Sequence, residues 1–83
     1  MKDTINDILR ISKELLYEQP FYGSVLISLL KEVDEKKTKT AAVGLNGIMF
    51  KLLVNPTFWD TLSDDHKQGL LIHELGHIIN FHL

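Results

Sequence analysis

The sequence contains no cysteine among its 83 residues. Disulfide bonds and thiolate metal ligands are therefore excluded, and a transition metal would have to be held by histidine, carboxylate or water. Basic side chains are not in excess either, because the formal net charge is −2. A charge of this sign offers no broad attraction for nucleic acid or for an anionic membrane, so we expect neither as a partner.

Long apolar segments are also missing. The N-terminus, Met1-Lys2-Asp3-Thr4, lacks the apolar stretch of a signal peptide. No run in the sequence approaches the roughly 18 apolar residues that a membrane-spanning helix needs. We therefore expect a cytoplasmic protein. The length of 83 residues predicts a single domain over residues 1–83, which can also be the N-terminal part of a longer protein.

Two amphipathic segments open the chain. Apolar residues recur at helical spacing on both sides of Pro20. We expect Thr4 to cap the first helix, with Asp7 three residues later as its capping-box partner. The second helix is expected to begin near Phe21 and to continue to Val33, the last residue that fits the same spacing.

The pattern changes in the second half of the chain. Two short apolar runs, residues 40–45 and 48–54, flank Asn46-Gly47, and both residues of that pair accept the positive φ angles of a type I′ turn. We therefore expect a β-hairpin, followed by a short helical turn that begins at Pro56. Ser63 can cap a last helix that runs to about Asn80. The fold class is thus α+β.

The last helix carries the motif His73-Glu74-Leu75-Gly76-His77. His73 and His77 lie one turn apart on the same side of a helix, so both imidazoles can bind one zinc ion. Glu74 is offset around the helix, where it can accept a proton from a zinc-activated water and later pass it to the leaving amine. The apolar residues of this helix occupy the opposite side, which predicts that the histidines face away from the core.

Two glycines, Gly69 and Gly76, share the side of the histidines. Glycine within a helix costs up to about 1 kcal/mol relative to alanine. We therefore expect another backbone, from the hairpin or from a substrate, to approach the helix at these positions. His66 lies about 10 Å along the axis from His73, and we expect it to be a surface residue.

The motif and its surroundings resemble zincins, whose active-site helix lies beneath a small sheet. Among them, the chain is most similar to a metallopeptidase domain of bacteria and phages that often precedes a von Willebrand factor A-like domain. The resemblance implies a minimal zincin-like domain of two N-terminal helices, a β-hairpin and a C-terminal active-site helix. It also implies His73 and His77 as zinc ligands and Glu74 as general acid/base. The resemblance rests on Leu71-Ile72-His73-Glu74-Leu75-Gly76-His77 with His82, and upstream on Pro20-Phe21-Tyr22-Gly23-Ser24-Val25-Leu26 and Asn55-Pro56-Thr57-Phe58.

The third zinc ligand is left open by the sequence. A catalytic zinc usually has three protein ligands, and His82 is the candidate within reach. His82 can join the site only if the last helix ends near Asn80, a residue that tolerates the left-handed conformation. A partner chain or a downstream domain is the other source. Over a shorter stretch the helix is also similar to that of bacterial repressor-cleaving peptidases, which usually place their next histidine one residue nearer than His82.

Two functions fit this sequence. The first is a zinc-dependent metallopeptidase core that hydrolyses peptide bonds of a peptide or protein substrate with zinc-activated water. The alternative is a catalytically weak or inactive metal-binding interaction module within a larger protein or assembly. Glu74 favours the enzyme, because a purely structural metal site needs no base. The length of 83 residues favours the module, because it leaves little chain to form substrate pockets.

Overall fold

The computed structural model of the chain describes residues 3–80, apart from the side chains of Asn46 and Asn80. Within these residues, no helix combines the length and the apolar character that crossing a membrane requires. The elements follow in the order α1 (Thr4–Glu18), α2 (Pro20–Ser28), β1 (Leu30–Val33), β2 (Ala41–Asn46), β3 (Met49–Val54), α3 (Pro56–Asp60) and α4 (Asp64–Asn80). The expected α+β class, with two N-terminal helices, a hairpin and a C-terminal helix, is confirmed.

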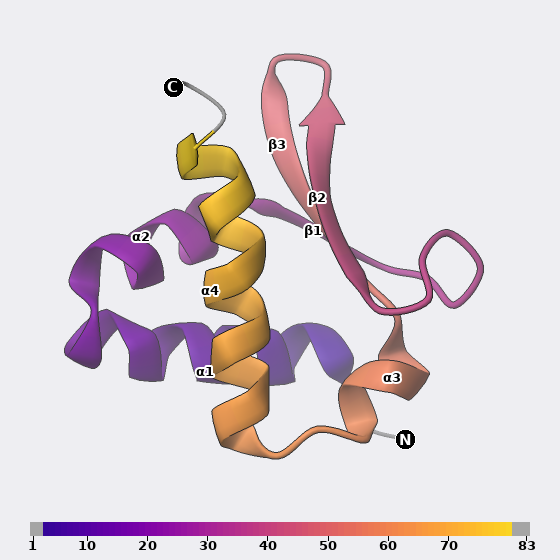
Figure 1. Ribbon diagram of the computed structural model, residues 1–83, viewed down its shortest axis with the longest axis horizontal. Coiled ribbons are helices and arrows are strands. Elements are labelled where there is room, and N and C mark those ends of the chain that lie inside the picture. Colours follow the sequence, from indigo (N-terminus) through magenta and orange to yellow (C-terminus); the bar gives the residue numbers. More distant parts are fainter. Residues whose placement is uncertain (1–2, 81–83) are drawn as a thin grey trace.

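The strands form one small sheet in which β3 is central, parallel to β1 on one side and antiparallel to β2 on the other. α4 runs alongside this sheet and contacts β2 as well as α1 and α2 (Figure 1). The helix that carries the histidine motif therefore packs against both halves of the fold.

The hydrophobic core lies where the helices meet the inner face of the sheet. α4 contributes Leu71 and Leu75, which are one turn apart and completely buried. Alternation along β3 places Leu52 and Val54 on the face that meets them, and both are also fully buried. Because the apolar side of α4 packs here, its histidine side faces outward, as the sequence predicted. The buried hydrophobic residues are Ile8, Ile11, Leu15, Leu26, Ala41, Leu52, Val54, Trp59, Leu71 and Leu75.

A partly buried charge network, the Asp7 network, joins α1, α3 and α4. Lys67 of α4 is only 3% exposed, and its Nζ donates to Oδ2 of Asp7 at 2.7 Å. Nε1 of Trp59 donates to the same oxygen at 2.8 Å. Arg10 bridges Asp7 and Asp64 at the surface, with donor–acceptor distances of 2.7 and 3.0 Å. These contacts fix the N-terminal half of α4 against the first helix.

The Asp7 network makes stability depend on pH at the acid end. Burial acts to raise the pKa of the Asp7 carboxyl, but hydrogen bonds from Lys67, Arg10 and Trp59 outweigh it and hold this pKa well below 3.8. The ionised carboxyl therefore stabilises the fold above pH 3.8, and this contribution is lost as the pH falls toward the lower pKa of the folded state.

We expect the free energy of unfolding, measured with urea, to fall by about 1–2 kcal/mol between about pH 5 and pH 2.5 on account of Asp7. Asp7→Asn removes the titrating group, so its profile should be flatter over the same range. An equally steep profile in Asp7→Asn would show that the loss arises from other carboxyls.

The second helix is shorter than the sequence predicted. α2 ends at Ser28, and Leu30–Val33 forms β1 in place of the expected last turn. Leu29 already has extended backbone angles, φ −69° and ψ 146°. Lys31 Nζ donates to the carbonyl oxygens of Ile27 and Leu29, which satisfies the end of the helix. A short apolar run is compatible with the period of a helix and with that of a strand. Here the pairing with the distant β3 makes the run a strand.

Two local predictions were wrong in detail. Asp3 caps α1 in place of Thr4, since its carboxylate accepts from the Asn6 backbone N–H at 3.2 Å. The hairpin loop consists of Gly47 and Ile48, and among the described residues Gly47 is the one with positive φ, 69°. Glycine with positive φ at the first of two loop positions is the pattern of a type II′ turn, not of type I′. Ile48 consequently leaves the strand and is 99% exposed.

Candidate metal centre

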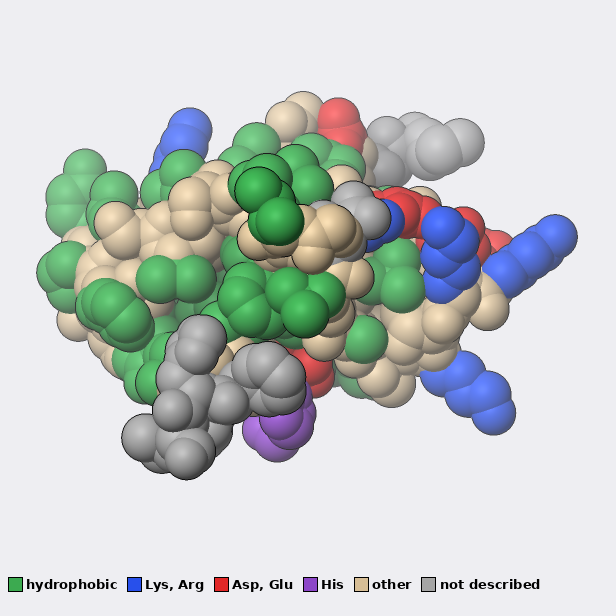
Figure 2. All heavy atoms as spheres, turned by 90° about the horizontal axis from the view of Figure 1, so that it is seen from above, with side chains coloured by type: hydrophobic (Ala, Val, Ile, Leu, Met, Phe, Trp, Pro, Cys, Tyr) green, Lys and Arg blue, Asp and Glu red, His purple; other side chains and the backbone are tan. Residues whose placement is uncertain are grey.

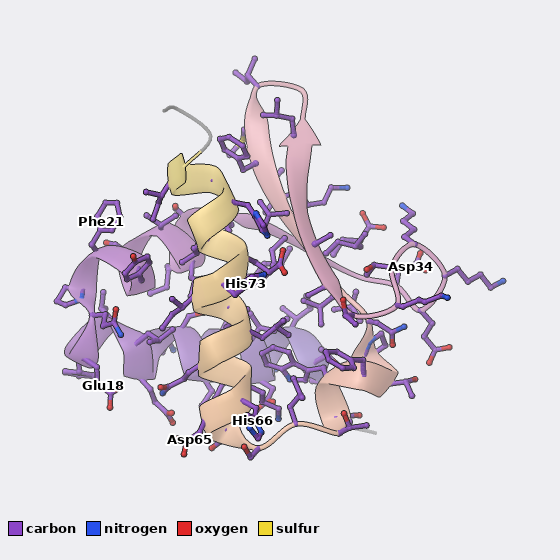
Figure 3. The ribbon with its side chains drawn as sticks, viewed as in Figure 1. Glu18, Phe21, Asp34, Asp65, His66 and His73 are labelled. Atoms are coloured by element: carbon purple, nitrogen blue, oxygen red, sulfur yellow. The ribbon has the colours of Figure 1, made fainter. Side chains whose placement is uncertain are left out.

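α4 begins and runs as the sequence predicted. Oγ of Ser63 accepts from the His66 backbone N–H at 3.3 Å, which caps the first turn. Asp64 and Asp65 lie in this turn, where their negative charges interact favourably with the positive end of the helix dipole. His73 lies midway along the helix, well separated from His66 near its start (Figure 3). His66 is exposed, which confirms its prediction as a surface residue.

His73 and His77 project from the same side of α4. Their ring centroids are 5.0 Å apart and the ring planes are inclined at 83°. Both residues are exposed, because Leu71 and Leu75 occupy the side that packs on the core. The two imidazoles therefore meet outside the core, where an ion can reach them.

Glu74 completes a group of possible ligands with the two histidines. One carboxylate oxygen of Glu74 and one ring nitrogen of each histidine lie within 4.8 Å of one another. Glu74 as a whole residue is only 8% exposed, so its stem is held by neighbours while its carboxylate reaches the histidine side. The sequence placed Glu74 beside the two imidazoles, and the structure brings all three together.

These donors suit a divalent transition metal. Imidazole nitrogen and carboxylate oxygen are both ordinary zinc ligands, and ligand atoms around a tetrahedral zinc lie about 3.4 Å apart. The three donor atoms all lie within 4.8 Å of one another, and the two exposed imidazoles can rotate to bring their nitrogens to the spacing that zinc requires. The residues present therefore fit a bound metal. His82 lies outside the described residues, so its role as a third ligand stays a prediction.

The expectation for the two glycines of α4 was wrong as far as the hairpin is concerned. A Cβ atom added at Gly69 or Gly76 would meet no atom within 4 Å. The hairpin backbone thus does not approach the helix at these two glycines, and each of them borders open space. The close helix packing occurs elsewhere, at Gly23, where an added Cβ would lie 2.5 Å from backbone atoms of Leu16.

A pocket beside the metal ligands was not foreseen from the sequence. It has a volume of about 220 Å³ and lies between the hairpin and the C-terminal half of α4. Period-two alternation could have assigned the strand residues to one face. No local signal shows, however, that α4 leaves this part of the face uncovered. The pocket is lined by Val43, Gly44, Leu45, Phe50, His77 and Ile78.

Comparison with known proteins gives a family and no individual relative. Residues 7–83 match the family described as "Putative metallopeptidase domain". No curated protein and no solved structure matches the chain. The matched region includes the whole hairpin and the whole of α4, and it agrees with the resemblance that the motif carries. With its His-Glu-His group assembled on α4, the chain belongs to the "Putative metallopeptidase domain" family.

Proposed function

We propose that the chain is the core of a zinc-dependent metallopeptidase, in which His73 and His77 bind the metal and Glu74 is the general acid/base. One observation carries the proposal: the three donors gather on the outward side of α4, in a chain of a metallopeptidase family. The substrate would be a peptide or protein. We further propose that residues 1–83 act as one domain and in the cytoplasm.

The protein's own residues would divide the work as follows. When bound, zinc supplies Lewis acidity, which polarises the scissile carbonyl and lowers the pKa of a water molecule toward about 7. Glu74 accepts the proton of the attacking water and delivers it to the leaving amine. Burial of the Glu74 stem supports this role, because a base held in place loses little freedom when the substrate arrives.

The third zinc ligand is a proposal, since His82 lies outside the residues that the structure describes. We propose that His82 supplies it, with a partner chain or downstream domain as the other source. Within residues 3–80 the possible metal ligands that come together are those of the His73, Glu74 and His77 group. X-ray absorption of the zinc-loaded protein would count three imidazoles if His82 binds, and two in His82→Ala.

Removing one histidine tests the metal site directly. Zinc bound by small protein sites contributes about 10–16 kcal/mol over four ligands, or about 3 kcal/mol each. We expect about one zinc per chain in the wild type, and an affinity about a hundredfold lower in His73→Ala and in His77→Ala. Elemental analysis after dialysis against a competing chelator measures this. His66→Ala on the same helix is the matched control and should retain its zinc. Full zinc retention in His73→Ala and His77→Ala would contradict the assignment.

A specific observation keeps the second function open. Hydrophobic side chains gather at the hairpin end of the molecule, near a histidine at the surface (Figure 2). Leu45, Ile48 and Met49 are 62%, 99% and 47% exposed. Exposed apolar groups of this kind are typical of surfaces that bind another protein. The alternative is therefore a catalytically weak or inactive metal-binding interaction module, and Glu74-dependent hydrolysis would decide against it.

A further inference from the structure

We infer that the pocket between the hairpin and α4 is a specificity pocket, which takes an apolar side chain of the substrate next to the peptide bond that is cleaved. This inference rests on the proposed function. It begins with the position of the pocket, because His77 forms part of its wall. A side chain in the pocket therefore contacts one of the two imidazoles proposed to bind the metal.

The chemistry of the lining selects the kind of side chain. Val43, Leu45, Phe50 and Ile78 are apolar and Gly44 has no side chain, so that among the described lining residues His77 alone has a polar side chain. A carboxylate or ammonium group placed here would lose hydration, and the described part of the lining offers it no charged side chain as a partner. An aliphatic or aromatic side chain would instead remove apolar surface from water on both sides.

The size of the pocket sets an upper limit on the side chain. An apolar cavity of about 150 Å³ is large enough to bind benzene, and this pocket measures about 220 Å³. Side chains up to the size of leucine or phenylalanine therefore fit. One residue of extended chain spans about 3.5 Å. A side chain that enters the pocket beside His77 therefore belongs to a residue adjacent to the scissile bond, which lies at the metal that His77 would bind.

The pocket exists because the hairpin extends beyond the core. Leu52 and Val54 of β3 are completely buried, whereas Phe50, two residues nearer the loop, is half-buried. Phe50 pairs with Leu45 across the two strands, and Leu45 is 62% exposed. This end of the inner face thus keeps its apolar side chains but is left partly uncovered beside the outward side of α4.

The first experiment measures preference and binding separately. Zinc-loaded protein is assayed on peptides that are identical except for leucine, phenylalanine, aspartate or lysine next to the cleaved bond. We expect kcat/KM to be about tenfold or more higher for leucine and phenylalanine. In parallel, the leucine and aspartate peptides are added to methyl-labelled Glu74→Gln, which prevents turnover. We expect the leucine peptide alone to shift the methyl resonances of Val43, Leu45 and Ile78.

A charge placed at the mouth of the pocket tests the assignment of its wall. Leu45→Glu changes an exposed residue, so the fold should be retained. We expect it to abolish the preference for leucine over lysine. Ala42→Glu is the matched control, since residue 42 pairs with Leu53 on the opposite face of the same sheet. It adds the same charge to the same strand and should keep the wild-type preference.

The outcomes separate this inference from the proposed function. Methyl shifts confined to the pocket, without hydrolysis of any peptide, would support the binding of an apolar side chain there and contradict the peptidase. Hydrolysis at equal rates for all four peptides, without such shifts, would overturn the pocket and leave the peptidase in place. Absence of both hydrolysis and shifts would overturn the pocket. Methyl shifts that depend on protein concentration in the absence of peptide would indicate that a second copy of the chain binds this surface. That result would also overturn the specificity pocket.

Discussion

Replacing Glu74 with glutamine is expected to lower the rate of peptide hydrolysis by about 100- to 10,000-fold, the usual contribution of a positioned general acid/base. Glutamine has nearly the same shape but cannot accept and return a proton. Glu74 is 8% exposed, so an isosteric change should preserve the packing of its stem. The metal should remain, because the proposal assigns its binding to His73 and His77.

The measurement compares zinc-loaded wild type and Glu74→Gln on a fluorogenic peptide library, with zinc content and melting temperature recorded for both. Asp65→Asn is the matched control, since it makes the same chemical type of change at an exposed position of the same helix. Loss of zinc together with activity would make Glu74 a ligand. Undiminished hydrolysis in Glu74→Gln would remove it from the proton transfer.

Replacing Gly23 with alanine is expected to remove a large part of the domain's free energy of unfolding. The added Cβ would lie 2.5 Å from both Cα and N of Leu16 and 3.0 Å from the carbonyl carbon of Leu15. These are backbone atoms of α1, so no side chain can turn aside and α2 would have to move away. Overpacking costs about 1–3 kcal/mol and occasionally more, against a total stability of about 3–5 kcal/mol for a core of this size.

Thermal unfolding followed by circular dichroism would show the effect as a fall in Tm of about 10 °C or more. Gly69→Ala is a control of opposite sign. A Cβ at Gly69 meets no atom within 4 Å, and alanine within a helix is favoured by up to about 1 kcal/mol. Its Tm should therefore rise. Equal effects of the two substitutions would show that α1 and α2 are not held at the observed distance.

The parts of the fold that the sequence predicted are those with a local cause. Ser63 caps α4, and the apolar spacing of that helix is a property of consecutive residues. The hairpin likewise follows from two runs around Gly47. β1 was missed because its backbone is paired to residues 51–54, and nothing within Leu30–Val33 records that partner. The burial of Lys67 was missed for the same reason, since Asp7 lies 60 positions away.

The candidate site also combines residues placed by local spacing with residues placed by packing between elements. His73, Glu74 and His77 are neighbours on one helix, so their spacing alone brought them together. The pocket wall joins residues from the hairpin to α4, and only the packing of those elements creates it. Gly23 was noted as part of a similar stretch, yet its contact with Leu16 depends on how two helices cross. Geometry between elements is what the sequence pattern does not contain.

The Asp7 network has a consequence for the metal site. It holds α4 through Lys67 and Asp64, roughly two turns before His73, and it does so with protein groups alone. Leu71 and Leu75 attach the helix to the core as far as the two histidines. The ligand-bearing half is therefore preorganised, and an arriving ion would not have to supply the free energy of folding. A chelator should then remove the metal while the protein remains folded. The free energy by which the ion stabilises the folded state would grow only with the logarithm of the ion concentration, as for any ligand that binds an already folded protein.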